Sequence, residues 1–214
     1  MSQREGWRKG LKVTGILIGA ALLLAAGVVG LYFFVMSNVE KPAYRVVEQQ
    51  GDFEIRDYPD LIVAEVTRRG DRYDALRAGF GPLASYIFAK ERAGEKIAMT
   101  APVTQDISAD IPVKGDKTWT VRFIMPSGYR LEDLPDPASQ DVRLTDLPAQ
   151  RRAAVRFSGV TTDSLIAEQE ARLRGWLAAK GLSPEEPPTY AYYNDPWTPG
   201  PLRRNEVLFD LPNP

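Results

Sequence analysis

One long apolar run stands near the start of the chain. No charged residue lies between Lys12 and Glu40, and residues 13–36 read VTGILIGAALLLAAGVVGLYFFVM. As an α-helix these 24 residues would rise about 36 Å, which is enough to cross a bilayer. A cleaved signal peptide has a shorter apolar region of about 7 to 15 residues. The pattern therefore predicts a retained transmembrane helix over residues 13–36.

Basic residues are concentrated before this run. Four of them lie within residues 1–12, whereas only Lys41 follows the run closely. Because positively charged flanks stay on the cytoplasmic side of a membrane, residues 1–12 are expected to form a cytoplasmic tail. Residues 39–214 are then expected to form an extracytoplasmic domain, periplasmic in a Gram-negative cell. The chain is predicted to be a single-pass membrane protein held by its N-terminal helix.

After the apolar run, the pattern changes to short segments with a period of two. Three come first, YRVVEQ, FEIRDY and LIVAEVTR, and turn residues separate them. Such alternation predicts antiparallel strands. Residues 71–90 then place apolar side chains three and four positions apart, which predicts an amphipathic helix with Asp71 as its N-cap. Two more strand-like segments follow, KIAMTAPVTQ and TWTVRFIMP.

The second half of the chain has the same order of elements. Strand-like segments VRLTDL and RRAAVRFSG precede a predicted helix over residues 162–180, and Gly181 suits its C-terminal cap. The segments TYAYY and NEVLFDL end the chain as strands. Strand, helix, strand, strand thus occurs twice. The predicted fold is one α+β domain, with a distorted antiparallel β-barrel built from two similar halves and two helices packed outside it.

Composition excludes several kinds of chemistry. The chain has neither cysteine nor histidine, so thiolate nucleophiles, a Ser-His-Asp arrangement and histidine ligands are all absent. Formal net charge is −1, and four basic residues against Glu5 in the first twelve positions leave −4 for the remainder. Binding to a nucleic-acid backbone is therefore not expected of the domain. The acidic residues do not follow metal-ligand spacing either, so no dedicated metal site is predicted.

Six short motifs occur in one order along the domain. They are EIRDYP at 54–59, FGPLASYI at 80–87, KIAMTAPV at 96–103, FIMP at 123–126, RRAAVRFSG at 151–159 and YNDPWTPGPLRRNEV at 193–207. Together they resemble the SOUL haem-binding protein family, and they span nearly all of residues 39–211. The resemblance implies a distorted β-barrel with two flanking helices. It also implies a non-covalent site for haem or another porphyrin between the first helix and the loop of the last hairpin.

The resemblance also implies which residues would contact the tetrapyrrole ligand. On the first helix they are Arg77, Phe80, Leu83, Ala84 and Ile87, and in the last hairpin they are Tyr193, Trp197, Arg203 and Arg204. Phe80 and Ala84 replace larger flexible side chains of the family, and a basic residue expected near Thr198 is missing. The two adjacent arginines either hold propionates bidentately or pair with neighbouring carboxylates. Trp197 either stacks on the ligand or plugs its own loop.

The missing histidine bears on how haem iron could be held. A Tyr, Met or Lys ligand would have to serve, or the iron would lack strong protein coordination. Met99 alternates with Ile97, Ala101 and Val103, which favours core packing over iron ligation. Binding without a histidine axial ligand is therefore expected.

Three functional hypotheses follow. The first is a membrane-anchored, non-enzymatic haem binder that buffers, shields or transfers its ligand outside the cytoplasm. The second is a small-molecule hydrolase or multidrug-type binding domain similar to gyrase-inhibitor-like barrels, with Glu54, Glu65, Tyr86 and Tyr193 as candidate groups. The third is an interaction protein of the membrane surface without a small ligand.

Overall fold

A computed structural model describes residues 23, 27, 30, 39–108 and 117–212. The predicted cytoplasmic tail, and the predicted transmembrane helix except Leu23, Gly27 and Gly30, lie outside the described residues. Within the described part of the chain, no helix is long and apolar enough to span a bilayer. The chain divides into the units Met1–Val39 and Glu40–Pro214, and the fold described below is that of the second unit.

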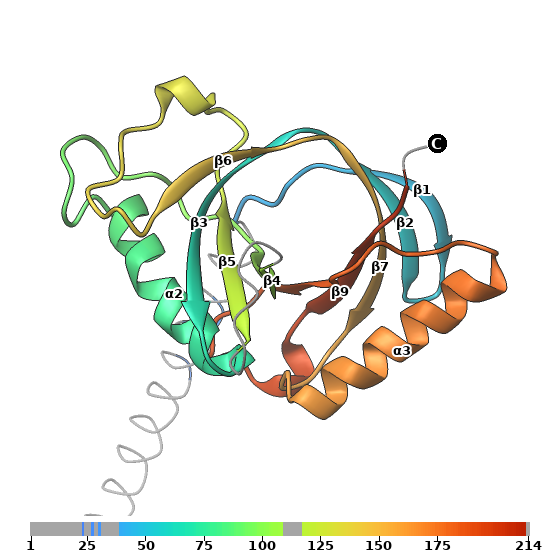
Figure 1. The fold of residues 1–214 in the computed structure, drawn as a ribbon. Coiled ribbons are helices and arrows are strands. Elements are labelled where there is room, and N and C mark those ends of the chain that lie inside the picture. Colours follow the sequence, from blue (N-terminus) through green and yellow to red (C-terminus); the bar gives the residue numbers. More distant parts are fainter. Residues whose placement is uncertain (1–22, 24–26, 28–29, 31–38, 109–116, 213–214) are drawn as a thin grey trace, which may run out of the picture. The chain divides into compact units, whose positions relative to one another are not determined.

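The domain combines one antiparallel sheet with two helices (Figure 1), as the predicted α+β class requires. Nine strands occur in the described residues, in the order β1-β2-β7-β9-β8-β4-β5-β3-β6. The strands are β1 Arg45–Gln50, β2 Phe53–Tyr58, β3 Leu61–Arg69, β4 Val103–Ile107, β5 Thr118–Ile124, β6 Arg143–Leu147, β7 Gln150–Phe157, β8 Thr189–Tyr192 and β9 Asn205–Asp210. The helices are α2 Arg72–Ile87 and α3 Asp163–Ala179, with 3-10 turns η1 Leu131–Asp133 and η2 Gly200–Leu202.

The predicted repeat is confirmed. The first half runs β3-α2-β4-β5 along the chain, and the second runs β7-α3-β8-β9. The two halves occupy matching places in the sheet, since β4-β5-β3-β6 mirrors β8-β9-β7-β2. The halves join where β4 pairs with β8, from Val103 opposite Tyr192 to Asp106 opposite Thr189. Each helix therefore covers its own half of one continuous sheet.

The sheet does not close into the predicted distorted barrel, because it has two edges, β1 and β6. Across the open side, the chain connects β2 to β3 and β6 to β7, and Figure 1 shows these segments arching over the interior. Their pairing keeps one register, from Phe53 opposite Val155 to Glu65 opposite Arg143. The ladder is interrupted only at Pro59 and Pro148, which have no amide proton to donate.

One predicted strand is shorter than its sequence pattern. The segment KIAMTAPVTQ was expected to be extended throughout, but β4 begins only at Val103. Pro102 cannot donate to a ladder, and Thr100 forms an isolated bridge with Glu40 instead. The backbone amide of Ala101 donates to the Glu40 carbonyl at 2.9 Å. The start of the domain is thereby fixed beside the start of β4.

Both helices begin and end close to their predicted limits. Asp71 holds the N-cap position of α2 in extended geometry, although its side chain makes no capping hydrogen bond. Thr162 caps α3, and its hydroxyl accepts from the Leu165 amide at 3.3 Å. Gly181 follows α3 with a φ of 70°, the left-handed conformation that glycine adopts without strain. The predicted role of Gly181 is confirmed.

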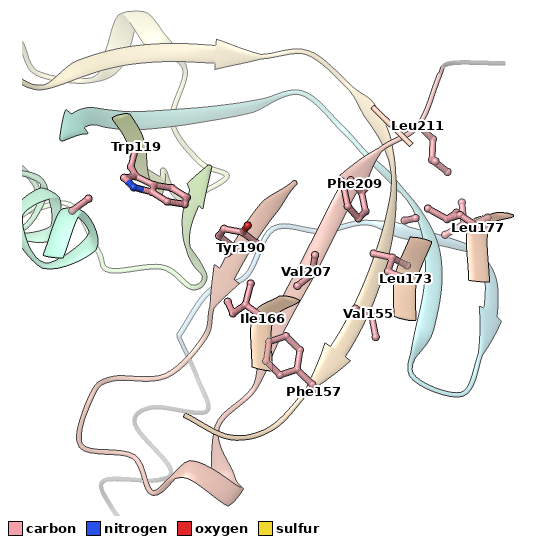
Figure 2. Close-up of a cluster of buried hydrophobic side chains, with 13 residues drawn as sticks. Trp119, Val155, Phe157, Ile166, Leu173, Leu177, Tyr190, Val207, Phe209 and Leu211 are labelled. Carbon is pink, nitrogen blue, oxygen red and sulfur yellow. The ribbon is translucent and has the colours of Figure 1, made fainter. Parts of the chain in front are cut away.

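Each helix packs on the sheet through its own apolar core. Leu83 and Ile87 of α2 pack with Val66, Val121 and Phe123 of β3 and β5. On the other side, α3 packs on β7 and β9, and Figure 2 shows Leu173, Leu177, Val155, Val207 and Phe209 in this cluster. The apolar faces of both helices are thus used by the fold, so a ligand can reach only their outer faces.

Gly79 should be essential for the close approach of α2 to the sheet. A Cβ atom there would lie 2.8 Å from Cγ2 of Val121 and 3.1 Å from Cγ2 of Val66. Gly79→Ala is therefore expected to lower the free energy of unfolding by about 1–3 kcal/mol in chemical denaturation. The matched control is Gly175→Ala in α3, where a Cβ would meet nothing within 4 Å. That change should raise stability by up to about 1 kcal/mol, and equal effects of both substitutions would contradict the packing described here.

Candidate functional site

The N-terminus of α2 is fastened to the second half of the fold by one buried arginine. The Arg72 guanidinium donates to Asp163 Oδ1 at 2.9 Å, to the Tyr192 hydroxyl at 2.8 Å and to the Thr161 carbonyl at 2.5 Å. Its own carbonyl accepts from Gln105 Nε2 at 2.8 Å. Helix α2 is therefore held beside the segment that leads into α3.

The β8–β9 loop, residues 193–204, is fixed to the same segment. The Gly159 amide donates to the Gly200 carbonyl at 3.0 Å, and Asn205 Nδ2 donates to the Gly159 carbonyl at 3.0 Å. A Cβ on Gly200 would lie only 3.3 Å from Val160 Cγ2, which shows how closely the two backbones approach. The residues just before α3 thus contact both α2, through Arg72, and the β8–β9 loop.

Helix α2 carries an exposed row of side chains, which we call the α2 stripe: Tyr73, Arg77 and Phe80. Spacings of four and three residues place them on one face. Tyr73 is 57% exposed and Phe80 is 42% exposed. The Arg77 guanidinium lies 5.8 Å from the Tyr73 ring centroid, and Phe80 packs edge-on against Phe123 at 5.1 Å. The α2 stripe therefore combines a cation with two accessible aromatic rings.

The other predicted residues of α2 lie on its inner side. Leu83, Ala84 and Ile87 are all buried in the core between α2 and the sheet. Their side chains contact β3 and β5 and not the solvent. Of the predicted residues on α2, Arg77 and Phe80 lie together on the outer face. Tyr73 lies next to them, although it was not among the predicted ligand contacts.

The β8–β9 loop is ordered by its own polar groups. Oδ1 of Asp195 accepts from the Trp197 amide at 2.7 Å and from the Thr198 amide at 3.0 Å. The Arg203 guanidinium donates to the Thr198 carbonyl at 2.7 Å and to the Pro196 carbonyl at 2.6 Å. Trp197 is 89% exposed, so its ring does not plug the loop. The indole is available to an external partner, whereas the Arg203 guanidinium already holds the loop.

Arg204 belongs to a buried charge network that the sequence did not predict as a unit. Glu206 accepts from Arg56 Nη1 at 2.7 Å and Nη2 at 3.0 Å, and from Arg204 Nη2 at 2.7 Å. The Tyr193 hydroxyl donates to Glu206 Oε2 at 2.9 Å, and Arg204 stacks over the Tyr193 ring at 4.0 Å. Of the two alternatives for Arg204, pairing with a neighbouring carboxylate is the one observed.

Burial and the neighbouring charges shift the pKa of Glu206 in opposite directions. Desolvation disfavours the Glu206 carboxylate, but hydrogen bonds and attraction from Arg56 and Arg204 outweigh it, so the pKa of Glu206 is lowered. Burial raises the pKa of Tyr193 well above its ordinary value, and the Glu206 charge adds to that shift. Tyr193 therefore remains a neutral hydrogen-bond donor, and Glu206 remains ionised and a weak base.

The four groups suggested for hydrolysis are all engaged. Glu54 accepts from Arg56 Nε at 2.6 Å, and Glu65 accepts from Arg122 Nε at 2.8 Å. Tyr86 donates to the Pro135 carbonyl at 2.9 Å, and Tyr193 is bound to Glu206. Both carboxylates are held by arginine and both tyrosine hydroxyls already donate hydrogen bonds, so none of the four groups is free to act on a substrate without breaking an existing contact.

A hollow of about 200 Å³ lies beside the C-terminal half of α2. The Ser85 hydroxyl on its wall has no hydrogen-bond partner among the described residues. No residue of the α2 stripe lines this hollow. Its lining comprises Gly81, Pro82, Ser85, Tyr86, Glu91, Arg92, Pro137, Ala138, Ser139 and Val142. The hollow and the predicted ligand site share no lining residue.

Protein donors for a metal are scarce near the α2 stripe. The part of the chain that the structure describes contains no cluster of three or more Asp or Glu side chains able to hold an ion. Met99 packs, partly buried, against the α2 core. The interpretation of Met99 as a packing residue is confirmed.

Comparison with known proteins gives one family. The family model described as "SOUL heme-binding protein" matches residues 39–210. Human heme-binding protein 2 is 32% identical over 164 residues, which cover 74% of this chain and 80% of the human protein. The mouse protein of the same name is 29% identical over 165 residues, with the same coverage of 74% and 80%.

Solved structures share the fold at low sequence identity. The C-terminal domain of EcmrR superposes with a TM-score of 0.56 at 14% identity, covering 80% of this chain and 99% of that domain. A Listeria innocua protein described as a hydrolase gives a TM-score of 0.54 at 14% identity, covering 76% and 93%. At such identity the likeness concerns the fold alone.

Glu206→Gln tests the buried charge network. It removes the carboxylate shared by Arg56 and Arg204 and leaves buried Arg56 with only the partly buried Glu54 as its partner, so the free energy of unfolding should fall by about 3–5 kcal/mol. Glu132→Gln, which breaks an exposed pair with Arg130, should have no measurable effect.

The pH profile of stability checks the same carboxylate. A lowered pKa stabilises the fold above the ordinary glutamate value of 4.5, and this contribution is lost as the pH falls below it. The decline in wild-type stability below pH 4.5 should therefore be shallower in Glu206→Gln. Wild-type stability in that variant, or an unchanged acid profile, would show that Glu206 does not balance the two arginines.

Proposed function

We propose that this chain, which belongs to the SOUL haem-binding protein family, binds haem or a related tetrapyrrole non-covalently on the α2 stripe. The curated relatives at 32% and 29% identity are named as heme-binding proteins, and they cover most of the domain. The proposed role is binding and not catalysis, since each group suggested for hydrolysis is already engaged. With a net charge of −4 beyond the first twelve residues, a nucleic-acid partner is not proposed.

The observation that carries this proposal is the free guanidinium of Arg77. Among the three predicted arginines, Arg203 holds loop carbonyls and Arg204 holds Glu206. Arg77 is exposed and forms no ion pair with the described residues; its neighbour is the Tyr73 ring. A guanidinium fork matches the carboxylate of a haem propionate, which neither of the committed arginines can take up without breaking existing contacts.

Exposed aromatic side chains complete the proposed binding surface. Phe80 presents part of its ring two turns along α2 from Tyr73, a rise of about 10 Å. Trp197 offers a large accessible ring in the β8–β9 loop, although it is not shown in contact with α2. Flat apolar rings of this kind suit the faces of a macrocycle. Leu83 and Ile87 would act from beneath, by holding α2 on the sheet.

The side chains of this surface suit a tetrapyrrole that is held mainly through its propionates and the faces of its ring. The chain has no histidine or cysteine, and Met99 faces the core. Bound haem would supply ligand-binding or electron-transfer chemistry, while the protein would supply charge pairing for the propionates and shielding of one face. Binding without an imidazole ligand favours a carrier whose ligand is exchanged over one that retains it permanently.

The predicted transmembrane helix bears on where in the cell this binding would take place. We propose that residues 13–36 hold the chain in a membrane with the domain on the extracytoplasmic side, where it buffers or passes on haem. The support is the apolar run with its four preceding basic residues.

Arg77→Ala should weaken haem binding. Loss of one charge-assisted contact to a propionate is expected to raise the hemin Kd about tenfold, or about 1.4 kcal/mol, in a Soret absorption titration. The matched control is Arg143→Ala, an exposed arginine on the edge strand β6. Trp197→Ala should also weaken binding if the β8–β9 loop covers the ligand. Equal Kd values for the wild type, Arg77→Ala and Arg143→Ala would place the ligand elsewhere.

Removal of residues 1–36 should release the domain from membranes. The full chain is expected to stay with the membrane fraction in alkaline carbonate and to be extracted by detergent, because a spanning helix is not held by charge. A protease added from outside should digest the domain in spheroplasts. Extraction of the full chain by carbonate alone would rule out a spanning anchor. Protection of the domain from the added protease would show that the domain lies on the cytoplasmic side.

A further inference from the structure

Most tyrosine hydroxyls in the described residues already take part in hydrogen bonds within the fold. Four donate hydrogen bonds, namely those of Tyr86, Tyr190, Tyr192 and Tyr193. The Tyr58 hydroxyl accepts from Arg56 Nη1 at 3.0 Å. Tyr44 lies against Tyr58 and beneath the Arg56 guanidinium, and Tyr129 packs on the α2 core. These seven side chains serve the fold.

Tyr73 differs from these seven in both exposure and position. It is 57% exposed, and its hydroxyl makes no hydrogen bond to the described residues. It stands one turn before Arg77 on the outer face of α2, with the guanidinium 5.8 Å from its ring centroid. A phenol oxygen in this place is free to approach a ligand that rests on the α2 stripe.

We infer that Tyr73 is the protein ligand of the iron when this chain holds haem, an inference that rests on the proposed function. On the α2 stripe, Arg77 would hold a propionate, Phe80 would contact the macrocycle and the Tyr73 hydroxyl would bind the iron. Tyrosine is a known axial ligand of haem iron, so no histidine is needed.

The ligand exchange is balanced without a redox step. Tyr73 would bind ferric iron as the phenolate, replacing a bound water as its O–H bond breaks. The proton passes to solvent, which reaches the exposed hydroxyl directly. Arg77 offsets negative charge on the same side of the complex. The iron stays ferric throughout, and the anionic oxygen ligand favours this state over ferrous iron.

Tyr73→Phe in the full chain, purified in detergent and titrated with hemin, tests this inference. Tyr129→Phe is the control, because Tyr129 is partly buried and packs on the α2 core. Absorption and resonance Raman spectra should show iron–phenolate bands in the wild type and in Tyr129→Phe. Tyr73→Phe should lose these bands and bind about tenfold more weakly, yet keep a saturable Soret change through Arg77 and the aromatic rings. Circular dichroism should be unchanged, because the hydroxyl that is removed has no partner in the fold.

The outcomes separate this inference from the proposed function. A saturable Soret change without phenolate bands in the wild type overturns the role of Tyr73 and leaves haem binding intact. Phenolate bands that persist in Tyr73→Phe also overturn it, since another oxygen would then hold the iron. The absence of any saturable change in the wild type overturns the proposed function and this inference together.

Discussion

The carboxylate of Glu206, bound by two guanidinium groups inside the sheet, decides which cations of this protein remain available. Arg56 and Arg204 converge on it from β2 and from the end of the β8–β9 loop, and Tyr193 donates to it from the end of β8. Release of either arginine from this buried carboxylate would break a charge-assisted hydrogen bond in a desolvated place. Together with Arg203, which holds the β8–β9 loop, the network leaves Arg77 as the uncommitted arginine of the predicted site.

The two halves of the domain repeat one fold but present different outer surfaces. Both helices use their inner faces to cover the sheet, so function depends on what each outer face carries. On α2 that face carries Tyr73, Arg77 and Phe80. On α3, Arg174 forms ion pairs with Glu186 and Glu170, so these charged side chains already have partners on the protein surface. Structures that share the fold at 14% identity need not share this difference, and the site must be argued from its own residues.

Much of the fold could be predicted because periodicity records which face of an element is buried. The repeat, both helices and the cap at Gly181 follow directly from the pattern. The open edges of the sheet could not be predicted, since the ladder is interrupted where Pro59 and Pro148 lie one register position apart on neighbouring segments. The short β4 has a similar cause, because Pro102 ends the extended pattern as a ladder.

The site was harder to predict than the fold because a charged residue in a strand does not reveal its partner. Arg56 sits in an alternating segment, and only the tertiary structure shows that its side chain meets Glu206 from the other end of the chain. Arg72 is similar, since it looks like a first-turn surface residue of α2 but is buried against Asp163 and Tyr192. The family motifs did point to α2, but not to which of its faces is accessible.

Carbene footprinting of the full chain with and without hemin tests most directly whether the α2 stripe is the ligand surface. Without hemin, Tyr73, Phe80 and Trp197 should be labelled, because all three are exposed. With hemin, labelling of the segment that holds Tyr73 and Phe80 should fall, whereas labelling of Val46 and Val47 on β1 should not change. Protection of residues 137–142 with unchanged labelling of Tyr73 and Phe80 would contradict this assignment and place the ligand in the hollow beside the C-terminal half of α2.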